Sequence, residues 1–346
     1  MKYGNFKDIQ IKKDALILAI ESSCDETACA VIKGGREILS SVINSSATEH
    51  IKFGGVVPEI ASRAHTSAIS ITVEKAVKDA NITLKDIDAI AVTYGAGLVG
   101  ALLVGVSYAK SLAQALNIPL VPVNHIRGHL SAIYLVDKKL TPPFISVLAS
   151  GGHTAIMLVK SYYEYQVIGQ TLDDAVGEAF DKVARTLGLS YPGGPNVERV
   201  ALQGQNNIPL PKMLKGKGLD FSYSGLKTAI INYINTKKMK GEEIVVADVA
   251  CSFQSSAIDV IVEKAIKSAK EYGIDTITAG GGVVANGYLR ESLTSACEKN
   301  NVKCYLPPKN LCTDNACMIG AEGYIQYINK NFADLSLNAK ASISLE

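Results

Sequence analysis

The stretch Val73-Glu74-Lys75-Ala76-Val77-Lys78-Asp79-Ala80 recurs in the second half of the chain as Val262-Glu263-Lys264-Ala265-Ile266-Lys267-Ser268-Ala269. Each copy predicts a helix that leads into an apolar strand followed by glycine, Ile87 to Tyr94 in the first half and Ile274 to Ala279 in the second. One such match can arise by chance. A second match, in the same order and context, decides whether the chain is duplicated.

The second match is a pair of predicted β-hairpins, each of which precedes one of these helices. Ala15 to Ile20 is followed by Thr27 to Lys33, and Phe144 to Ala149 is followed by Thr154 to Lys160. The hairpins are 127 residues apart (154 − 27) and the helices 189 (262 − 73), so the second half carries about 62 extra residues, placed between roughly 165 and 245. Hairpin followed by helix and strand predicts two duplicated α/β domains that face each other across a cleft.

Length and composition agree with this organisation. The chain has 346 residues, which suits two domains, and 47% hydrophobic residues, which suits substantial cores. The formal net charge of +2 neither requires nor excludes a nucleic-acid partner, so such a surface has to be local. Lysines do gather in the extra segment and form either a phosphate-contacting surface or a solvated face: Lys212, Lys215, Lys217, Lys227, Lys237, Lys238 and Lys240.

The first residues and the cysteines indicate a cytoplasmic protein. The N-terminus, MKYGNFKDIQIKKD, is charged and lacks the apolar core of a secretory signal. No purely apolar stretch approaches the roughly 18–20 residues of a membrane span. The seven cysteines include no C-x-x-C pair, which favours reduced thiols over disulfides.

Two of the five histidines, His125 and His129, are four residues apart in the string Asn124-His125-Ile126-Arg127-Gly128-His129. On a helix capped by Asn124, this spacing places both rings on one face with Cβ atoms about 5–6 Å apart, which suits two ligands of one metal ion. The alternative is a pair of surface or capping histidines. Asp314, placed in the first turn of the last predicted helix with Thr313 as its cap, is the candidate for an anionic third ligand.

Other candidate ligand-binding segments follow predicted strands, where α/β proteins bind their ligands. Glu21 to Thr27 carries acids that suit a metal-bound phosphate or a substrate hydroxyl, or that simply form a hairpin turn. Ser150 to Thr154 and Gly280 to Asn286 are glycine-rich and suit a backbone that approaches an anionic ligand or a nucleotide, the second leading into a helix that begins near Ala285. In the extra segment, three acids are predicted on one helical face: Asp174, Glu178 and Asp181.

Eight motifs in this order resemble the TsaD family of tRNA threonylcarbamoyladenosine synthases: ESSCDETA, NHIRGH, LASGGHT, DDAVGEAFDK, YPGGP, FSYSGLK, GGGVVAN and TDNA. The resemblance extends from about Leu16 to Tyr327, and ESSCDETA is similar to the bacterial and organellar branch. It implies the duplicated ribonuclease-H-like fold of actin, sugar kinases and heat-shock chaperones, with a nucleotide cleft between the domains. The domain boundaries that follow are an N-terminal extension at 1–13, a first domain at 14–135 plus 312–333, a second domain at 136–311, and a tail at 334–346.

The resemblance also implies an activity. Members of the family transfer a threonylcarbamoyl group from threonylcarbamoyl-AMP to the exocyclic amine of adenosine 37 in tRNAs that read codons beginning with A. An adenine amine is a poor nucleophile, so the carbonyl carbon has to be activated as a mixed anhydride. The family's partners are tRNA, a paralogous actin-fold protein similar to TsaB and a small ATPase similar to TsaE.

The family's site residues are carried over motif by motif. His125, His129 and Asp314 match the ligands of one divalent metal per subunit, iron or zinc. Asp25 and Glu26 are candidates for a general base or for ordering the incoming nucleotide, and His153 is left unassigned. Glu198 stands where bacterial relatives often have Asp, and Val284 where Ala is usual. The positions that match substrate-binding residues are Leu148, Ala149, Ser150, Gly151, Gly152, Asp181, Gly194, Glu198 and Asn286.

Three other functions share parts of these features. A zinc metallopeptidase needs a glutamate between histidines of this spacing, whereas Ile126, Arg127 and Gly128 stand there. A sugar-kinase-like ATP phosphotransferase shares the fold but needs only magnesium and a polar sugar pocket. A nucleotide-switched scaffold would bind partners without turnover.

Overall fold

The structure is a computed structural model that describes residues 3–6, 8–211, 214 and 218–344. The chain forms two compact units. The first unit comprises the residues up to Leu140 together with those from Asp314 onward, and the second comprises Thr141–Thr313. Lys212, Lys215 and Lys217 of the predicted lysine surface lie outside the described residues.

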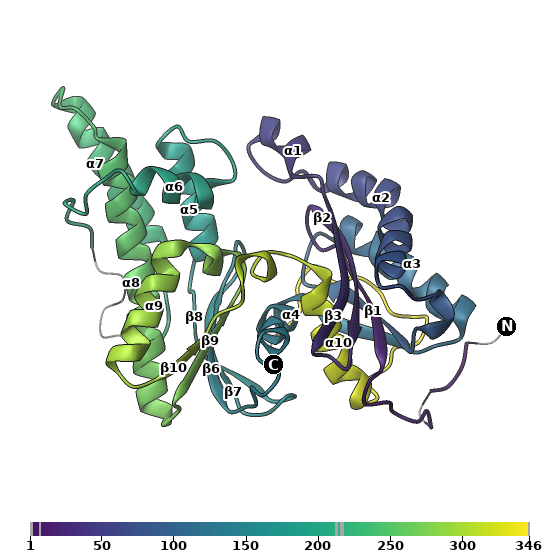
Figure 1. Ribbon diagram of the computed structural model, residues 1–346. Helices are drawn as coiled ribbons and strands as arrows, with labels where there is room; N and C mark the ends of the chain where they lie inside the picture. The colour runs from purple at the N-terminus through teal and green to yellow at the C-terminus, as the bar shows by residue number, and fades with distance from the viewer. Residues whose placement is uncertain (1–2, 7, 212–213, 215–217, 345–346) are drawn as a thin grey trace. The chain divides into compact units, whose positions relative to one another are not determined.

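The first unit is built on a five-stranded sheet of order β3-β2-β1-β4-β5, of which β1, β2 and β3 are labelled in Figure 1. The first three strands are antiparallel neighbours, and β1, β4 and β5 run parallel, with Ile17 opposite Ala89. The elements are β1 (Leu16–Glu21), β2 (Glu26–Lys33), β3 (Glu37–Ser45), α1 (Ala47–His50), α2 (Pro58–Asp79), β4 (Ala89–Gly95), α3 (Val99–Leu116), β5 (Leu120–Asn124), α4 (His125–Ser131) and α10 (Ala316–Ile328), with short 3₁₀ turns at Ile51–Phe53, Leu84–Asp86 and Ala132–Leu135.

Helices cover both faces of this sheet, which explains why its central strands are apolar on both sides. Leu18 and Ile20 of β1 pack with Val73 of α2 and Val106 of α3. On the opposite face, α10 lies so close that its glycines contact the strands. Burial on both faces is typical of the parallel part of an α/β sheet.

The helix α3 is long and apolar enough to cross a membrane by length and composition, and it is the one such helix in the described part of the chain. Its residues Val106, Ala109 and Ala113 belong to the core between the sheet and α2. Packing within the first unit therefore accounts for the buried face of this helix, whereas Val99 and Leu103 are exposed.

The second unit repeats the first. Its sheet has the order β10-β9-β6-β7-β8, so that β6 to β10 take the places of β1 to β5 with the same strand directions. The elements are β6 (Phe144–Ala149), β7 (Thr154–Val159), β8 (Tyr165–Gln170), α5 (Val176–Thr186), α6 (Gly193–Ala201), α7 (Ser224–Met239), α8 (Val246–Tyr272), β9 (Thr276–Gly280), α9 (Gly287–Lys299) and β10 (Lys303–Tyr305), with 3₁₀ turns at Gly282–Ala285 and Lys309–Leu311. The predicted duplication of a ribonuclease-H-like α/β domain is confirmed.

The extra residues of the second unit carry α5, α6 and α7 and follow β8, because β8 itself occupies the place of β3. Asp173 holds the start of α7: its carboxylate accepts hydrogen bonds from the backbone N–H groups of Tyr223 and Ser224 at 2.7 and 3.2 Å. It also accepts from the hydroxyls of Ser222 and Ser224. The FSYSGLK motif is thus a helix start that is capped from a distant loop.

The segment after α10 returns along the edge of the first sheet. Ala333 forms a bridge with Leu120, and the N–H of Lys340 donates to the carbonyl oxygen of Tyr94 at 2.8 Å. Near its end, the carbonyl oxygen of Ser344 accepts from Nδ2 of Asn124 at 3.0 Å. This C-terminal segment therefore packs beside the residue that caps α4.

Candidate functional site

The two histidines of the NHIRGH motif lie on α4, as predicted. The helix begins where β5 ends, because Oδ1 of Asn124 accepts the N–H of Ile126 at 2.9 Å and caps it. The spacing of four brings the rings of His125 and His129 together, with centroids 4.7 Å apart and planes at 83°. Both histidines are largely buried.

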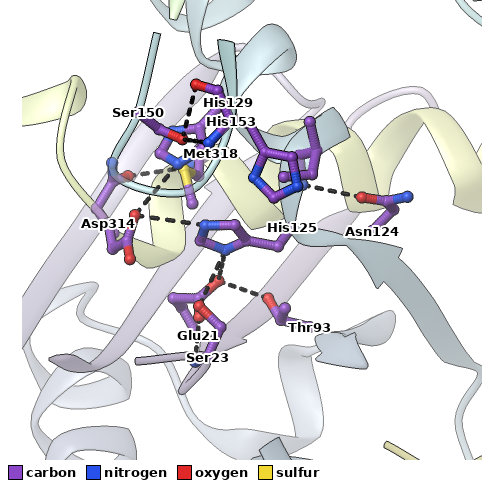
Figure 2. Close-up of polar contacts among 12 residues, drawn as sticks. Glu21, Ser23, Thr93, Asn124, His125, His129, Ser150, His153, Asp314 and Met318 are labelled. Carbon is purple, nitrogen blue, oxygen red and sulfur yellow. Dashed lines mark hydrogen bonds and ion pairs between the residues drawn. The ribbon is translucent and has the colours of Figure 1, made fainter. Parts of the chain in front are cut away.

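Asp314 completes the cluster (Figure 2). Its Oδ1 lies 3.2 Å from Nε2 of His129 and 3.5 Å from Nε2 of His125. One donor atom from each of the three residues lies within 4.8 Å of the others. The spacing within α4 could predict the histidine pair, but only the return of the chain to the first unit places the carboxylate beside it.

The predicted start of the last helix was wrong in its detail. The helix α10 begins at Ala316, and its cap is Asn315, whose side chain accepts the N–H of Met318 at 3.0 Å. Asp314 therefore lies in the preceding loop, not in the first turn, and Thr313 is not the cap. Asn was an equally good capping residue, and it leaves the Asp314 carboxylate available to the histidines.

Three residues behind His125 were not predicted to contact the histidines, although Glu21 and Ser23 belong to the segment whose acids were predicted to bind a ligand. Oε2 of Glu21, at the end of β1, lies 3.0 Å from Nδ1 of His125, and Oγ of Ser23 lies 3.1 Å from the same nitrogen. The hydroxyl of Thr93, at the end of β4, donates to Oε2 of Glu21 at 2.7 Å. Their positions at neighbouring strand ends are a usable signal, since β1 and β4 are parallel.

The charges of this cluster favour a cation. Burial lowers the pKa of His125, but the negative charges of Asp314 and Glu21 outweigh burial and raise that pKa to about 9. Burial raises the pKa of Asp314, yet the charge of His125 and the hydrogen bond from His129 hold it well below its usual range. The two carboxylates thus stabilise the positive charge of a protonated His125. A bound metal ion would supply positive charge at the same place.

The donor set fits a divalent transition metal. Two imidazole nitrogens and one carboxylate oxygen suit zinc or iron and leave coordination positions open for a substrate. The ring of His129 is held by fewer hydrogen bonds than that of His125, because its Nδ1 is buried and has no hydrogen-bond partner among the described residues.

A second candidate region is a pocket within the second unit. Five of the residues predicted to bind substrate line it: Gly151, Asp181, Gly194, Glu198 and Asn286. Of the other predicted residues, Leu148 and Ala149 are fully buried in β6, and Ser150 and Gly152 belong to the turn that follows. The remaining lining residues are Gly177, Phe180, Pro192, Pro195, Gly282, Val283 and Ala285.

Glycines let the loops around this pocket approach one another closely. Gly281 has a φ of +101°, and a Cβ there would lie 2.4 Å from the carbonyl oxygen of Ala149. A Cβ on Gly177 would lie 2.7 Å from the carbonyl oxygen of Ser150. These glycines therefore serve close packing of the loops, as well as leaving backbone near the pocket.

The polar side chains of the pocket are held in place by the backbone. Oδ1 of Asp181 accepts the N–H of Gly193 at 2.7 Å, and Oε1 of Glu198 accepts the N–H of Gly287 at 2.8 Å. Burial raises the pKa of Asp181 despite the N–H donors of Gly193 and Gly194. The predicted acidic face of a helix was wrong, because Asp174 precedes α5 and pairs with Lys182 at 2.8 Å, while Asp181 turns to the start of α6.

Asn286 is held on both sides of its amide. Its Oδ1 caps α9 by accepting the N–H of Leu289 at 3.1 Å, and its Nδ2 donates to Oε1 of Gln254 at 2.8 Å. The helix α9 begins at Gly287 rather than near Ala285, because a 3₁₀ turn at Gly282–Ala285 comes first. Gln254 is a buried residue of α8 that was not predicted to reach this site.

The candidate acids Asp25 and Glu26 lie at the turn between β1 and β2, in the first unit. Ser46 donates both its N–H and its hydroxyl to the carbonyl oxygen of Asp25, at 2.9 Å each, and the hydroxyl of Ser45 donates to Oε1 of Glu26 at 3.2 Å. Burial and the neighbouring charge of Asp25 raise the pKa of Glu26 to about 9. Glu26 is therefore protonated near neutral pH.

The described lysines of the predicted basic surface are partly neutralised. Lys227 lies 3.8 Å from Asp174, and Lys237 lies 2.5 Å from Glu242. These pairs favour a solvated face of α7 over a dedicated phosphate-binding surface.

The duplicated ribonuclease-H-like fold places the chain in the class of actin-like folds, with the histidine–carboxylate cluster in one unit and the glycine-lined pocket in the other. Solved structures show the same fold: full-length HypF has a TM-score of 0.63 at 17% identity, over 92% of this chain and 47% of that one, so this chain spans about half of it. Component A of the (R)-2-hydroxyglutaryl-CoA dehydratase of Acidaminococcus fermentans has a TM-score of 0.53 at 15% identity, over 92% and 98%.

Within that class, the chain belongs to the TsaD family. The family's sequence model, described as tRNA N6-adenosine threonylcarbamoyltransferase, matches residues 37–321. A protein of that name from Clostridium novyi (strain NT) is 53% identical over 338 residues, 97% of this chain and 99% of the relative. Its counterpart from Clostridioides difficile (strain 630) is 53% identical over 334 residues, 96% and 99%. Neither comparison supports a metallopeptidase or a sugar kinase.

Proposed function

We propose that this protein is a tRNA adenosine(37) threonylcarbamoyltransferase. The similarity over nearly the whole length of the relatives named for this activity carries the proposal. The geometry adds support, because the three residues that match the family's metal ligands converge although Asp314 lies 185 positions after His129 (314 − 129).

In the proposed reaction, a C–N bond replaces a C–O bond at the carbamoyl carbon. The exocyclic amine of adenosine 37 attacks the carbamoyl carbon of threonylcarbamoyl-AMP, a C–N bond forms, the C–O bond to the phosphate breaks, and AMP leaves with the electron pair. The amine loses one proton to a base. When bound, a divalent metal would supply positive charge that stabilises the leaving AMP.

Metal binding, substrate binding and proton transfer would be carried out by different residues of the chain. His125, His129 and Asp314 would hold the metal, zinc or iron. The pocket of Gly151, Asp181, Gly194, Glu198 and Asn286 would bind the adenylate, with Leu148, Ala149, Ser150 and Gly152 shaping its loop. A protonated Glu26 suits hydrogen-bond donation to the substrate, which leaves Asp25 as the candidate base.

The proposal includes partners and a compartment. A TsaB-like paralogue and a TsaE-like ATPase would act with this protein, and the site of action would be the cytoplasm. Each protein would be required in the reconstituted reaction described next.

The test is nucleoside mass spectrometry on unmodified tRNA. The protein is incubated with the partner proteins, threonine, bicarbonate, ATP and a threonylcarbamoyl-AMP synthase. Wild type should form threonylcarbamoyladenosine, and Asp314→Ala should lose metal and reduce the rate by at least about 100-fold, since it removes the anionic ligand. Asp275→Asn, which alters an exposed ion pair with Lys303, is the matched control and should keep full activity. Absence of product with wild type, while a known relative works under the same conditions, would refute the transferase proposal.

A further inference from the structure

We propose that Glu21 is a positioning residue of the metal centre: its buried carboxylate fixes the orientation and tautomer of His125, so that Nε2 of this ring faces the metal. The proposal rests on the proposed metal site and adds a residue that does not itself bind the metal.

Glu21 is placed for this purpose by the sheet. It is the last residue of β1, its exposed fraction is 0%, and its Oε2 lies 3.0 Å from Nδ1 of His125 (Figure 2). Thr93 donates its hydroxyl to Oε2 at 2.7 Å, and the N–H of Ser23 donates to Oε1. Both oxygens are thus fixed by neighbours, and the carboxylate has little freedom to turn.

The hydrogen-bonding chemistry then determines the state of the imidazole. An ionised carboxylate can only accept, so Nδ1 of His125 has to carry the proton in this contact. In a neutral ring the lone pair is then on Nε2, the nitrogen that faces Asp314 at 3.5 Å. A histidine that donates its second ring nitrogen to a carboxylate is the usual arrangement around bound metals, because it orients the ring and makes the ligating nitrogen more basic.

The two histidines differ in this respect. Nδ1 of His125 has Glu21 and Ser23 within hydrogen-bond distance, whereas the buried Nδ1 of His129 has no partner among the described residues. The supporting polar groups are therefore concentrated on His125. A second buried negative charge beside a dication also increases the electrostatic preference for a divalent over a monovalent cation.

The experiment measures metal affinity on the full chain. Zinc dissociation constants are determined by chelator competition for wild type, Glu21→Gln, Glu21→Ala and Thr93→Val, and cobalt is used to record the visible absorption bands of the bound ion. Loss of such supporting carboxylates typically weakens metal binding about 10–100-fold. We expect about tenfold weakening for Glu21→Gln, more for Glu21→Ala, and shifted cobalt bands in both, with a smaller effect for Thr93→Val.

Glu322→Gln is the matched control. Glu322 is also fully buried in the first unit, where it accepts hydrogen bonds from Ser131 and Gln326 at 2.6 Å each, and neither of these partners belongs to the candidate metal centre. If Glu21 has a purely structural role, Glu21→Gln and Glu322→Gln should both lower thermal stability, and neither should change zinc affinity. If Glu21→Gln, Glu21→Ala and Thr93→Val all bind zinc as wild type does, the proposal is overturned.

Asp314→Ala separates this result from failure of the proposed function. If wild type and Asp314→Ala bind zinc equally, the metal site itself is wrong, and the role of Glu21 falls with it. If Asp314→Ala loses zinc and the Glu21 variants do not, the metal site stands and only the positioning role is refuted.

Discussion

Glu26 couples stability to pH. Its folded-state pKa is raised from 4.5 to about 9 by burial and by Asp25. Between these values the folded state holds a proton that the unfolded chain releases, so the free energy of unfolding falls as pH rises, by at most about 1.4 kcal/mol per pH unit. Below about pH 4.5 both states are protonated and the effect vanishes.

Glu26→Gln should therefore stabilise the metal-free protein at pH 8 and have little effect at pH 5. The measurement is the thermal unfolding midpoint at both pH values in the presence of chelator. Glu59→Gln, at an exposed residue paired with Arg63 on α2, is the control and should give no pH-dependent difference. Equal shifts at pH 5 and pH 8 would contradict a raised pKa.

Predictions from sequence were confirmed where the geometry depends on local spacing. His125 and His129 share one face of α4 because a helix repeats every 3.6 residues, and Asn124 caps that helix as its residue type predicts. Glu21, Thr93 and Gln254 could not be predicted in this way, because their partners lie 104, 72 and 32 positions away along the chain. Such contacts depend on strand order and helix packing, which spacing alone does not give.

At the scale of single elements, the close approach of α10 to the sheet depends on the glycines of this helix. A Cβ on Gly323 would lie 2.4 Å from Cβ of Ala91, in the middle of β4. Since Ala91 has no rotamer to change, Gly323→Ala has to push α10 away from the sheet. Overpacking of this kind costs about 1–3 kcal/mol, which exceeds the gain of about 0.5–1 kcal/mol from a better helix former.

Gly323→Ala should lower the free energy of unfolding of the first unit, measured by chemical denaturation. Gly55→Ala is the control, because a Cβ at Gly55 meets nothing within 4 Å. A Gly323→Ala protein as stable as wild type would show that the helix can move outward at no cost. Zinc affinity should fall in the same variant, since Asp314 lies only two residues before the first residue of this helix.

The elements themselves were predicted well where apolar strands follow one another. The hairpin strands were predicted to within one residue, and Phe144–Ala149 was predicted without error. Helix starts were less accurate, because several residues near each start can cap a helix. Thr313 and Asn315 are both good caps, and the observed choice depends on the loop that leads back from the second unit.

At the scale of the whole molecule, the two candidate sites belong to different units. The three candidate metal ligands lie in the first unit, and the glycine-lined pocket lies in the second. Zinc at 100 times its dissociation constant should stabilise the first unit by about 2.7 kcal/mol, because it binds only the folded site. AMP, used as a probe, should act on the second unit.

Hydrogen exchange followed by mass spectrometry checks this division. Zinc should slow exchange in α4 and around Asp314, and AMP should slow exchange in α5, α6 and the turn at Gly282–Ala285. The zinc effect should disappear in Asp314→Ala while the AMP effect persists. Protection of the second unit by zinc alone would show that the two sites are energetically coupled.

The duplication was predictable because repeats leave a sequence signal, whereas residue spacing did not show that the chain returns to the first unit after Thr313. The core of the first unit is complete only with α10, which lies against β1, β2, β4 and β5. Only the family resemblance assigned the last helix to the first domain. The spacing of apolar residues shows that a terminal helix has a buried face, but it does not show which of two similar sheets that face covers.

That return also sets an order of events during synthesis. The residues up to Leu140 emerge from the ribosome first, but α10 and Asp314 follow only after the 173 residues of Thr141–Thr313 have been made. At translation rates of about 5–20 residues per second, the nascent first sheet waits roughly 10–35 s with one apolar face uncovered. A metal ion that needs Asp314 would therefore be acquired only after the whole of the second unit has been made.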